Sequence, residues 1–135
     1  MEDEKVRINT TIVAIYSSNI ETLGDFYKAA LNLKEIDKSD DYICLARKGI
    51  EINIIKMNGK PGKEIEPEEY LHIREETPIK CSFVVDSFEQ VVIANERFGG
   101  KLKDEKNAWE WRGQLHLDGY DPEGNVLQYR KGIDC

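Results

Sequence analysis

Residues 11–32 read TIVAIYSSNIETLGDFYKAALN, and this stretch pairs a strand with a helix that follows it directly. In residues 11–18, Val13 and Ile15 alternate with a second set of side chains, which predicts a strand with two distinct faces. Ser18-Asn19-Ile20-Glu21 has the spacing of a capping box. Beyond it apolar residues recur at intervals of three and four, which predicts a helix that ends near Asn32.

The same order returns in residues 80–100, KCSFVVDSFEQVVIANERFGG. Residues 80–85 alternate as a strand does, and Asp86 and Glu89 repeat the spacing of the cap. An apolar face follows and stops at Gly99 and Gly100, where a helix C-terminus is expected. The chain therefore contains two copies of one unit.

Short strands are expected after each helix, separated by turn residues. They are residues 42–46 and 51–56 in the first half, and residues 109–111, 114–117 and 126–130 in the second. Each half therefore follows the order β-α-β-β, with room for one further strand. Residues 58–78 are rich in Gly, Pro, Glu and Lys and form the linker, with a short helix expected over residues 68–73.

Length and composition limit the possible classes of protein. A chain of 135 residues is long enough for one domain with its own core, so we expect residues 1–135 to form a single domain. Module one covers about residues 8–57 and module two about residues 79–131. The formal charge of −7 argues against a nucleic-acid partner, because binding to phosphates requires a basic surface.

Targeting signals and cysteine chemistry give the expected compartment. The sequence has no run of the roughly 20 apolar residues that span a bilayer, and its first residues do not resemble a signal peptide. Cys44, Cys81 and Cys135 are odd in number and widely spaced, which fits neither a disulfide framework nor a structural zinc site. We expect a cytoplasmic protein with reduced thiols and no membrane partner.

Three stretches resemble the vicinal oxygen chelate superfamily, which includes glyoxalase I, the bleomycin-resistance proteins and the extradiol dioxygenases. Residues 14–33 resemble its first strand, helix cap, Phe-Tyr helix pair and helix exit. Residues 83–86 resemble the Val-Asp that opens its second module. Asp121-Pro122-Glu123-Gly124-Asn125 resembles the Asp-Pro-Asp-Gly-Asn turn before its last strand, with one conservative change.

This resemblance implies an α+β fold in which two tandem βαβββ modules form a curved mixed sheet. The helices of such a fold cover the outer face, and the ligand lies on the inner face. Side chains of a strand alternate between the two faces, so sequence position sorts them. The outer, core-forming set is Val13, Ile15, Ile52, Ile54, Cys81, Phe83, Val85, Leu115, Leu117, Leu127 and Tyr129. The inner set is Ile12, Ala14, Tyr16, Glu51, Asn53, Lys80, Ser82, Gln114, His116, Asp118, Gln128 and Arg130.

The four positions that carry metal ligands in the superfamily's enzymes match Ile12, Asn53, Lys80 and Gln128. A divalent ion of this kind binds imidazole nitrogens and carboxylate oxygens. An aliphatic side chain, two amides and an ammonium group cannot replace these ligands. The resemblance therefore implies a site without metal or other cofactor, although a displaced metal at Glu51 and His116 remains an alternative.

The remaining inner-face residues point to a small organic ligand. We expect Asn53, Lys80, Trp109, Trp111, His116, Gln128 and Arg130 to bind it. The two tryptophans share one face and offer a stacking surface for a planar or cationic group, or alternatively cover the sheet rim or a dimer contact. His116 is a candidate general base with Glu51, or else a hydrogen-bonding residue.

Three functions stay open at this point. The first is a non-enzymatic small-molecule-binding protein of the glyoxalase and bleomycin-resistance type. The second is a glyoxalase-like lyase, isomerase or dioxygenase that uses a displaced metal or acid-base chemistry of His116 and Glu51. The third is a scaffold, since fold does not fix function. The resemblance also implies a homodimer, because relatives often pair modules across chains.

Overall fold

The computed structural model describes residues 10–57, 73 and 76–133. The first module consists of one helix and four strands: β1 (Thr11–Ser17), α2 (Ile20–Leu31), β2 (Lys34–Lys38), β3 (Tyr42–Arg47) and β4 (Ile50–Lys56). The second consists of one helix, a single 3₁₀ turn and five strands: β5 (Cys81–Val84), α4 (Phe88–Phe98), β6 (Lys101–Leu102), η1 (Glu105–Asn107), β7 (Trp109–Trp111), β8 (Gln114–Tyr120) and β9 (Val126–Gly132).

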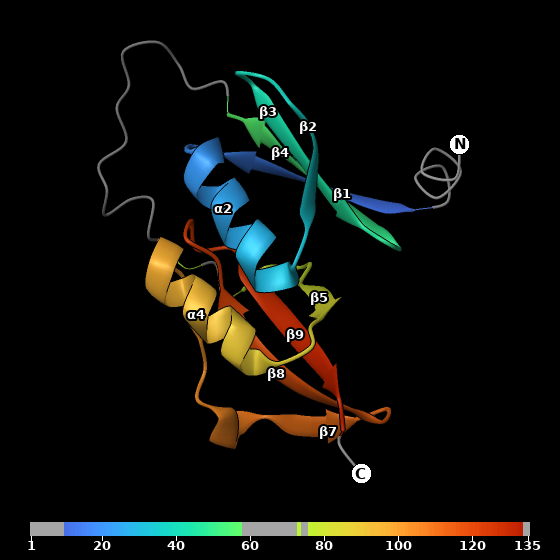
Figure 1. Cartoon of the computed structure of the whole chain (residues 1–135). Coiled ribbons are helices and arrows are strands. Elements are labelled where there is room, and N and C mark those ends of the chain that lie inside the picture. Colours follow the sequence, from blue (N-terminus) through green and yellow to red (C-terminus); the bar gives the residue numbers. More distant parts are fainter. Residues whose placement is uncertain (1–9, 58–72, 74–75, 134–135) are drawn as a thin grey trace.

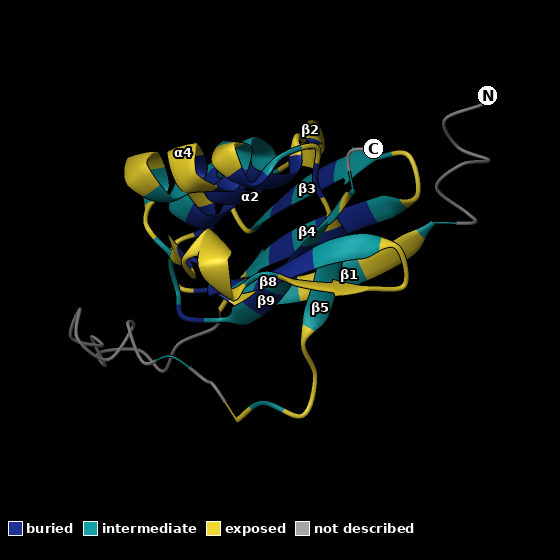
Figure 2. Cartoon of the chain, turned by 90° about the horizontal axis from the view of Figure 1, so that it is seen from below, coloured by how far each residue is buried: buried dark blue, intermediate teal, exposed yellow. Residues whose placement is uncertain are grey.

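The two modules repeat one topology. In the first sheet the strand order is β1-β4-β3-β2, and in the second it is β5-β9-β8-β6, with β7 paired to β8. The first strand of each module runs parallel to the last, as β1 does with β4 and β5 with β9. The helices α2 and α4 lie side by side and cover the same face of the molecule (Figures 1 and 2). The expected α+β fold of two βαβββ modules is confirmed, with hydrogen bonds joining the strands into two sheets.

Each helix begins one residue later than the capping-box spacing predicts. The N-cap of α2 is Asn19, whose side chain accepts a hydrogen bond from the backbone N–H of Thr22. The N-cap of α4 is Ser87, which accepts from the N–H of Gln90. Asn32, in the left-handed conformation, ends α2 where predicted.

The core lies between the helices and the outer faces of the two sheets. All eleven residues expected on this face belong to the core or pack against its buried side chains. Phe26 and Tyr27 from α2 are fully buried in it, as is Val91 from α4. The division of strand residues into two faces is therefore confirmed, and it fixes which side chains remain for a site.

Hydrogen bonds join the Asp-Pro turn of module two to module one. Asp121 is fully buried, and its carboxylate accepts hydrogen bonds from the Tyr27 hydroxyl at 2.7 Å, the Asn125 side chain at 2.8 Å and two backbone N–H groups. Glu123 accepts bonds from the Ser17 hydroxyl and, at 3.0 Å, from the N–H and the hydroxyl of Ser18. Residues more than 90 positions apart are thereby joined at Tyr27 of α2 and just before the N-terminal end of this helix.

Burial raises the pKa of Asp121, although its hydrogen bonds with Tyr27 and Asn125 act in the opposite direction. Burial also raises the pKa of Tyr27 well above its ordinary value, and the neighbouring Asp121 carboxylate adds to this shift. A buried carboxylate is costly unless donors surround it. The tyrosine hydroxyl of module one therefore helps to stabilise the turn of module two.

Most of the linker, residues 58–72 and 74–75, is outside the described residues, as are Cys135 and most of the short helix expected over residues 68–73. Ile73 is described and is not helical. In the described part of the chain, no helix has the length and apolar character needed to cross a membrane.

Candidate functional site on the second sheet

The β7–β8 hairpin sets the position of both tryptophans. Arg112 and Gly113 form its two-residue turn with φ values of 52° and 78°, the left-handed pair that suits a tight hairpin. The resulting register pairs Trp109 with His116 and Trp111 with Gln114. Both indoles therefore lie on the inner face of the second sheet, which is the face opposite α4 and the core.

Trp109, Trp111 and His116 form what we call the aromatic end of this face. The Trp109 ring stacks on the His116 ring with centroids 5.5 Å apart. The Trp111 ring is tilted against the same imidazole, with centroids 5.7 Å apart. This packing leaves His116 only 2% exposed, while Trp109 and Trp111 remain 40% and 58% exposed. The indoles thus keep open aromatic surface that a flat ligand can cover.

The hydrogen bonding of His116 assigns its tautomer. Its Nδ1 lies 3.1 Å from the backbone oxygen of Gln114. A carbonyl oxygen only accepts hydrogen bonds, so Nδ1 carries the proton and a neutral ring has Nε2 as an acceptor. In the neutral ring, Nε2 is therefore an acceptor within an imidazole that the two indoles leave only 2% exposed.

Arg130 lies beside His116, because the two residues are register partners on β9 and β8. Its guanidinium donates from Nε to the Ser82 hydroxyl at 2.9 Å and from Nη1 to the Gln114 side chain at 2.9 Å. Ser82 in turn donates to Gln128 at 2.8 Å. Two neutral partners hold the guanidinium in place, and its other N–H groups have no carboxylate partner among the described residues.

The polar chain continues from Gln128 to Asp118, whose side chains lie 3.5 Å apart. Lys80 forms an ion pair with Asp118 at 2.9 Å. The polar side chains of β5, β8 and β9 therefore form one connected network, which fixes their positions on the inner face.

Two further lysines complete the face. Lys101 pairs with Tyr120 across β6 and β8, and the N–H of Lys103 bonds to the backbone oxygen of Asp118. Gly119 permits this approach, since a Cβ there would lie 2.5 Å from the backbone oxygen of Lys101. We call Lys80, Lys101 and Lys103 the lysine end. Together with Asp118 they line a cavity of about 510 Å³.

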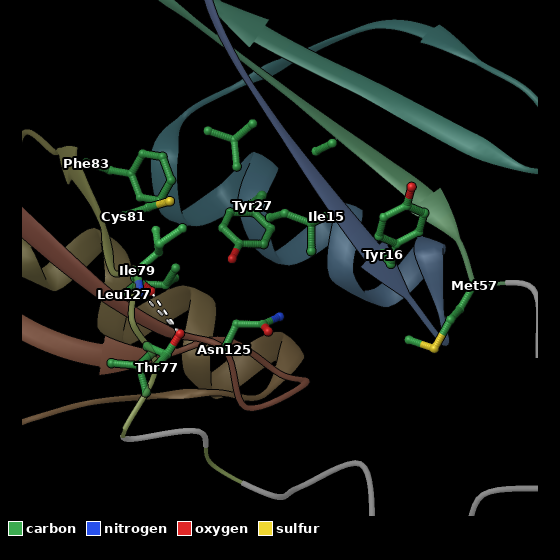
Figure 3. Close-up of a pocket in the computed structure, with 13 residues that line it drawn as sticks. Ile15, Tyr16, Tyr27, Met57, Thr77, Ile79, Cys81, Phe83, Asn125 and Leu127 are labelled. Carbon is green, nitrogen blue, oxygen red and sulfur yellow. Dashed lines mark hydrogen bonds between the residues drawn. The ribbon is translucent and has the colours of Figure 1, made fainter.

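A second cavity of about 310 Å³ lies between β1 and β5 (Figure 3). Its walls are mainly apolar, with Ile15 on one side and Cys81 and Phe83 on the other, and Tyr27 and Asn125 extend into it. No residue that the sequence identified as a ligand or catalytic candidate lines it. We therefore place the candidate site on the inner face of the second sheet.

Six of the seven ligand candidates are brought together there: Lys80, Trp109, Trp111, His116, Gln128 and Arg130. Asn53, the seventh, lies on β4 in the first sheet, as does the acid-base candidate Glu51. Glu51 is buried, and no hydrogen bond or ion pair among the described residues links it to the second sheet. Lys101 and Lys103 were missed, because a two-residue strand has no periodicity from which to read a face.

Three of the four positions matched to the superfamily's metal ligands do not fit a metal ion, and the fourth, Asn53, offers a single buried amide oxygen that has no hydrogen-bond partner among the described residues. Ile12 is an exposed aliphatic side chain, and the Lys80 ammonium already pairs with Asp118. The oxygen of the Gln128 amide is occupied by Ser82. Across residues 10–57, 73 and 76–133, no three His, Cys, Asp or Glu side chains gather as a metal site requires.

Solved structures share this architecture. No protein-family model matches the sequence, and a search of curated proteins finds no match. A glyoxylase/bleomycin resistance protein/dioxygenase domain from Frankia sp. EAN1pec superposes with a TM-score of 0.62 at 14% identity, over 92% of this chain and 97% of that one. The fosfomycin resistance protein FosX from Listeria monocytogenes gives a TM-score of 0.61 at 14% identity, covering 91% of this chain and 92% of FosX.

Lactoylglutathione lyase from Agrobacterium tumefaciens is also similar, with a TM-score of 0.55 and 15% identity over 90% of this chain and 92% of the lyase. These identities are low, so the likeness concerns the fold. The chain has the vicinal oxygen chelate fold, as the resemblance of its sequence implied.

Proposed function

We propose that this protein binds a small organic molecule on the inner face of its second sheet, without a metal ion at the superfamily's four ligand positions. The observation that carries the proposal is the connected polar network that lies beside two exposed tryptophans on one face. Small-molecule sites combine apolar surface with a few fixed polar groups. This face has both, and its polar groups are held by hydrogen bonds to one another.

The donor set at the matched positions supports binding without metal. A metal ligand must offer a lone pair, and an ammonium group offers none while adding positive charge where the ion would sit. The ion pair with Asp118 holds the Lys80 ammonium group at this position. The ligand is accordingly held by hydrogen bonds, stacking and charge supplied by this chain.

Acid-base catalysis by His116 and Glu51 together has less support. The two residues lie in separate sheets, and the stacked indole of Trp109 covers His116. A general base must reach the proton that it removes, directly or through one water. We therefore prefer the binding function to the enzyme, and we also propose the homodimer expected from the superfamily.

The chain offers a direct test, because its two tryptophans are both at the aromatic end. In protein labelled with ¹⁵N-tryptophan, only two indole N–H signals appear, and both report on the proposed site. A fragment collection of acids, bases and neutral aromatic compounds should contain members that shift both signals, with Trp111→Phe assigning them. Fragments that bind the protein elsewhere and leave both indole signals in place would contradict the proposed site.

A further inference from the structure

The inner face of the second sheet carries an excess of positive charge. Four cationic side chains lie on this face: Lys80, Lys101, Lys103 and Arg130. Among the described residues of β5–β9 on the same face, Asp118 is the one carboxylate. The whole chain has a formal charge of −7, so the surplus of cations here is local. Like charges gathered on one surface repel one another unless an anion lies between them.

The partners of these cations are few. Lys80 pairs with Asp118, whereas Lys101, Lys103 and Arg130 have no ion pair within the described part of the chain. Lys101 and Lys103 both line the cavity of about 510 Å³ that Asp118 and Lys80 also line. The lysine end can therefore hold an acid group with two ammonium groups that are not neutralised.

The aromatic end lies at a defined distance along β8. Residues on one face of a strand are about 6.6 Å apart, so Asp118 and Tyr120 lie about 7 and about 13 Å from His116. Lys103 is beside Asp118 and Lys101 is beside Tyr120. Arg130 is fixed beside His116 on the neighbouring strand β9, level with the aromatic end.

Resting on the function proposed above, we infer that the ligand is an elongated organic anion with a flat ring at one end and an acid group about 7 to 13 Å away. The ring stacks on Trp109 and Trp111. The acid group lies at the lysine end, where Lys101 and Lys103 face the cavity. The N–H groups of Arg130 that Ser82 and Gln114 do not use contact polar atoms near the ring.

Four matched probes test the stacked ring and the acid group separately. The titration follows tryptophan fluorescence with 4-(2-naphthyl)butanoate, its alcohol, its amine and 4-cyclohexylbutanoate. The naphthyl acid should bind about tenfold more tightly than the alcohol, since each exposed ion pair contributes up to about 1 kcal/mol. The amine and the cyclohexyl acid should both bind more weakly than the naphthyl acid, the first through repulsion and the second through lost stacking.

Charge variants locate the acid group. Lys101→Gln with Lys103→Gln should weaken binding of the naphthyl acid by about fivefold or more and leave the alcohol unchanged. Lys48→Gln with Lys56→Gln makes the same change in net charge at exposed positions of the first module, and it should leave both affinities unaltered. The affinity for the acid should fall with added salt in the wild type and much less in the Lys101/Lys103 variant.

The outcomes distinguish the inference from the proposed function. If the alcohol or the amine shifts tryptophan fluorescence at the same concentration as the acid, the site stands and the anionic class is wrong. The class is also wrong if the Lys101/Lys103 variant and the Lys48/Lys56 control behave alike. If none of these probes and no member of the fragment collection perturbs either tryptophan, the proposed function itself fails.

Discussion

Tyr27→Phe removes one oxygen atom, and with it the hydroxyl that joins helix α2 to the turn of module two. The Tyr27 hydroxyl donates to buried Asp121 at 2.7 Å, and Tyr27 itself has no exposed surface. The variant therefore leaves a buried carboxylate with one donor fewer. A hydrogen bond to a charged group contributes about 1.5 to 3 kcal/mol. Three donors to Asp121 remain, so we expect the variant to lose about 2 kcal/mol of unfolding free energy at neutral pH.

Urea denaturation is the assay. For a protein of this size the dependence of the unfolding free energy on urea is about 2 kcal/mol per molar, so the midpoint should fall by about 1 M. Tyr42→Phe is the matched control, because the hydroxyl of Tyr42 donates at 3.0 Å to the exposed carboxylate of Asp37. There water replaces the donor, and the midpoint should hardly move.

The pH dependence gives a second, independent check. Burial raises the pKa of Asp121 above its ordinary value of 3.8, and the bond from Tyr27 lowers it. Tyr27→Phe therefore raises this pKa further. A raised pKa in the folded state means that the carboxyl favours folding most when protonated, and that this advantage is lost as pH rises through the folded pKa. The difference in unfolding free energy between variant and wild type should be full near pH 7 and shrink as the pH falls through the raised pKa of Asp121. Equal losses of unfolding free energy for Tyr27→Phe and Tyr42→Phe would refute this account of the Tyr27–Asp121 hydrogen bond. A difference between Tyr27→Phe and wild type that grows as the pH falls would also refute it.

Three other predictions concern the faces, the metal and the assembly. Phe83→Ala should cost about 3 to 5 kcal/mol as a core truncation, whereas Ser82→Ala, on the inner face, should cost less because it removes a single half-buried hydroxyl; thermal melts in the reverse order would show that the faces are misassigned. Gln128→Glu should not create zinc, nickel, iron or manganese binding, since one carboxylate cannot replace three missing ligands; elemental analysis showing about one metal per chain would contradict this. Light scattering should give a mass near twice the 15.6 kDa of one chain, and a value near 15.6 kDa would exclude the homodimer.

Much of the fold could be predicted because its signals are local. The apolar spacing of residues 20–31 and 88–98 gives both helices, and alternation in the longer strands gives their faces. The residue that caps each helix was misplaced by one position, because Ser, Asn and Asp cap equally well and lie next to one another at residues 18–19 and 86–87. Ser18 instead binds Glu123, a partner 105 residues away.

The site was predicted less completely because it depends on contacts between distant residues. Alternation placed Trp109, Trp111 and His116 on one face, and the structure brings them together. Nothing local indicated that Gly119 would admit β6 with Lys101 and the following Lys103, or that Asp121 would be a buried acceptor rather than only a turn residue. Asn53 and Glu51 were grouped with the site by alternation together with the resemblance, and they lie on β4 in the first sheet.

The most direct test of the central claim is a titration of the two indole N–H signals with 4-(2-naphthyl)butanoate, carried out with and without excess EDTA. The claim is that this fold binds an organic ligand on its second sheet with its own side chains and no metal ion. We predict that both signals shift and that the dissociation constant is the same in the two titrations. Binding that disappears with EDTA and returns on adding a divalent metal would contradict the claim.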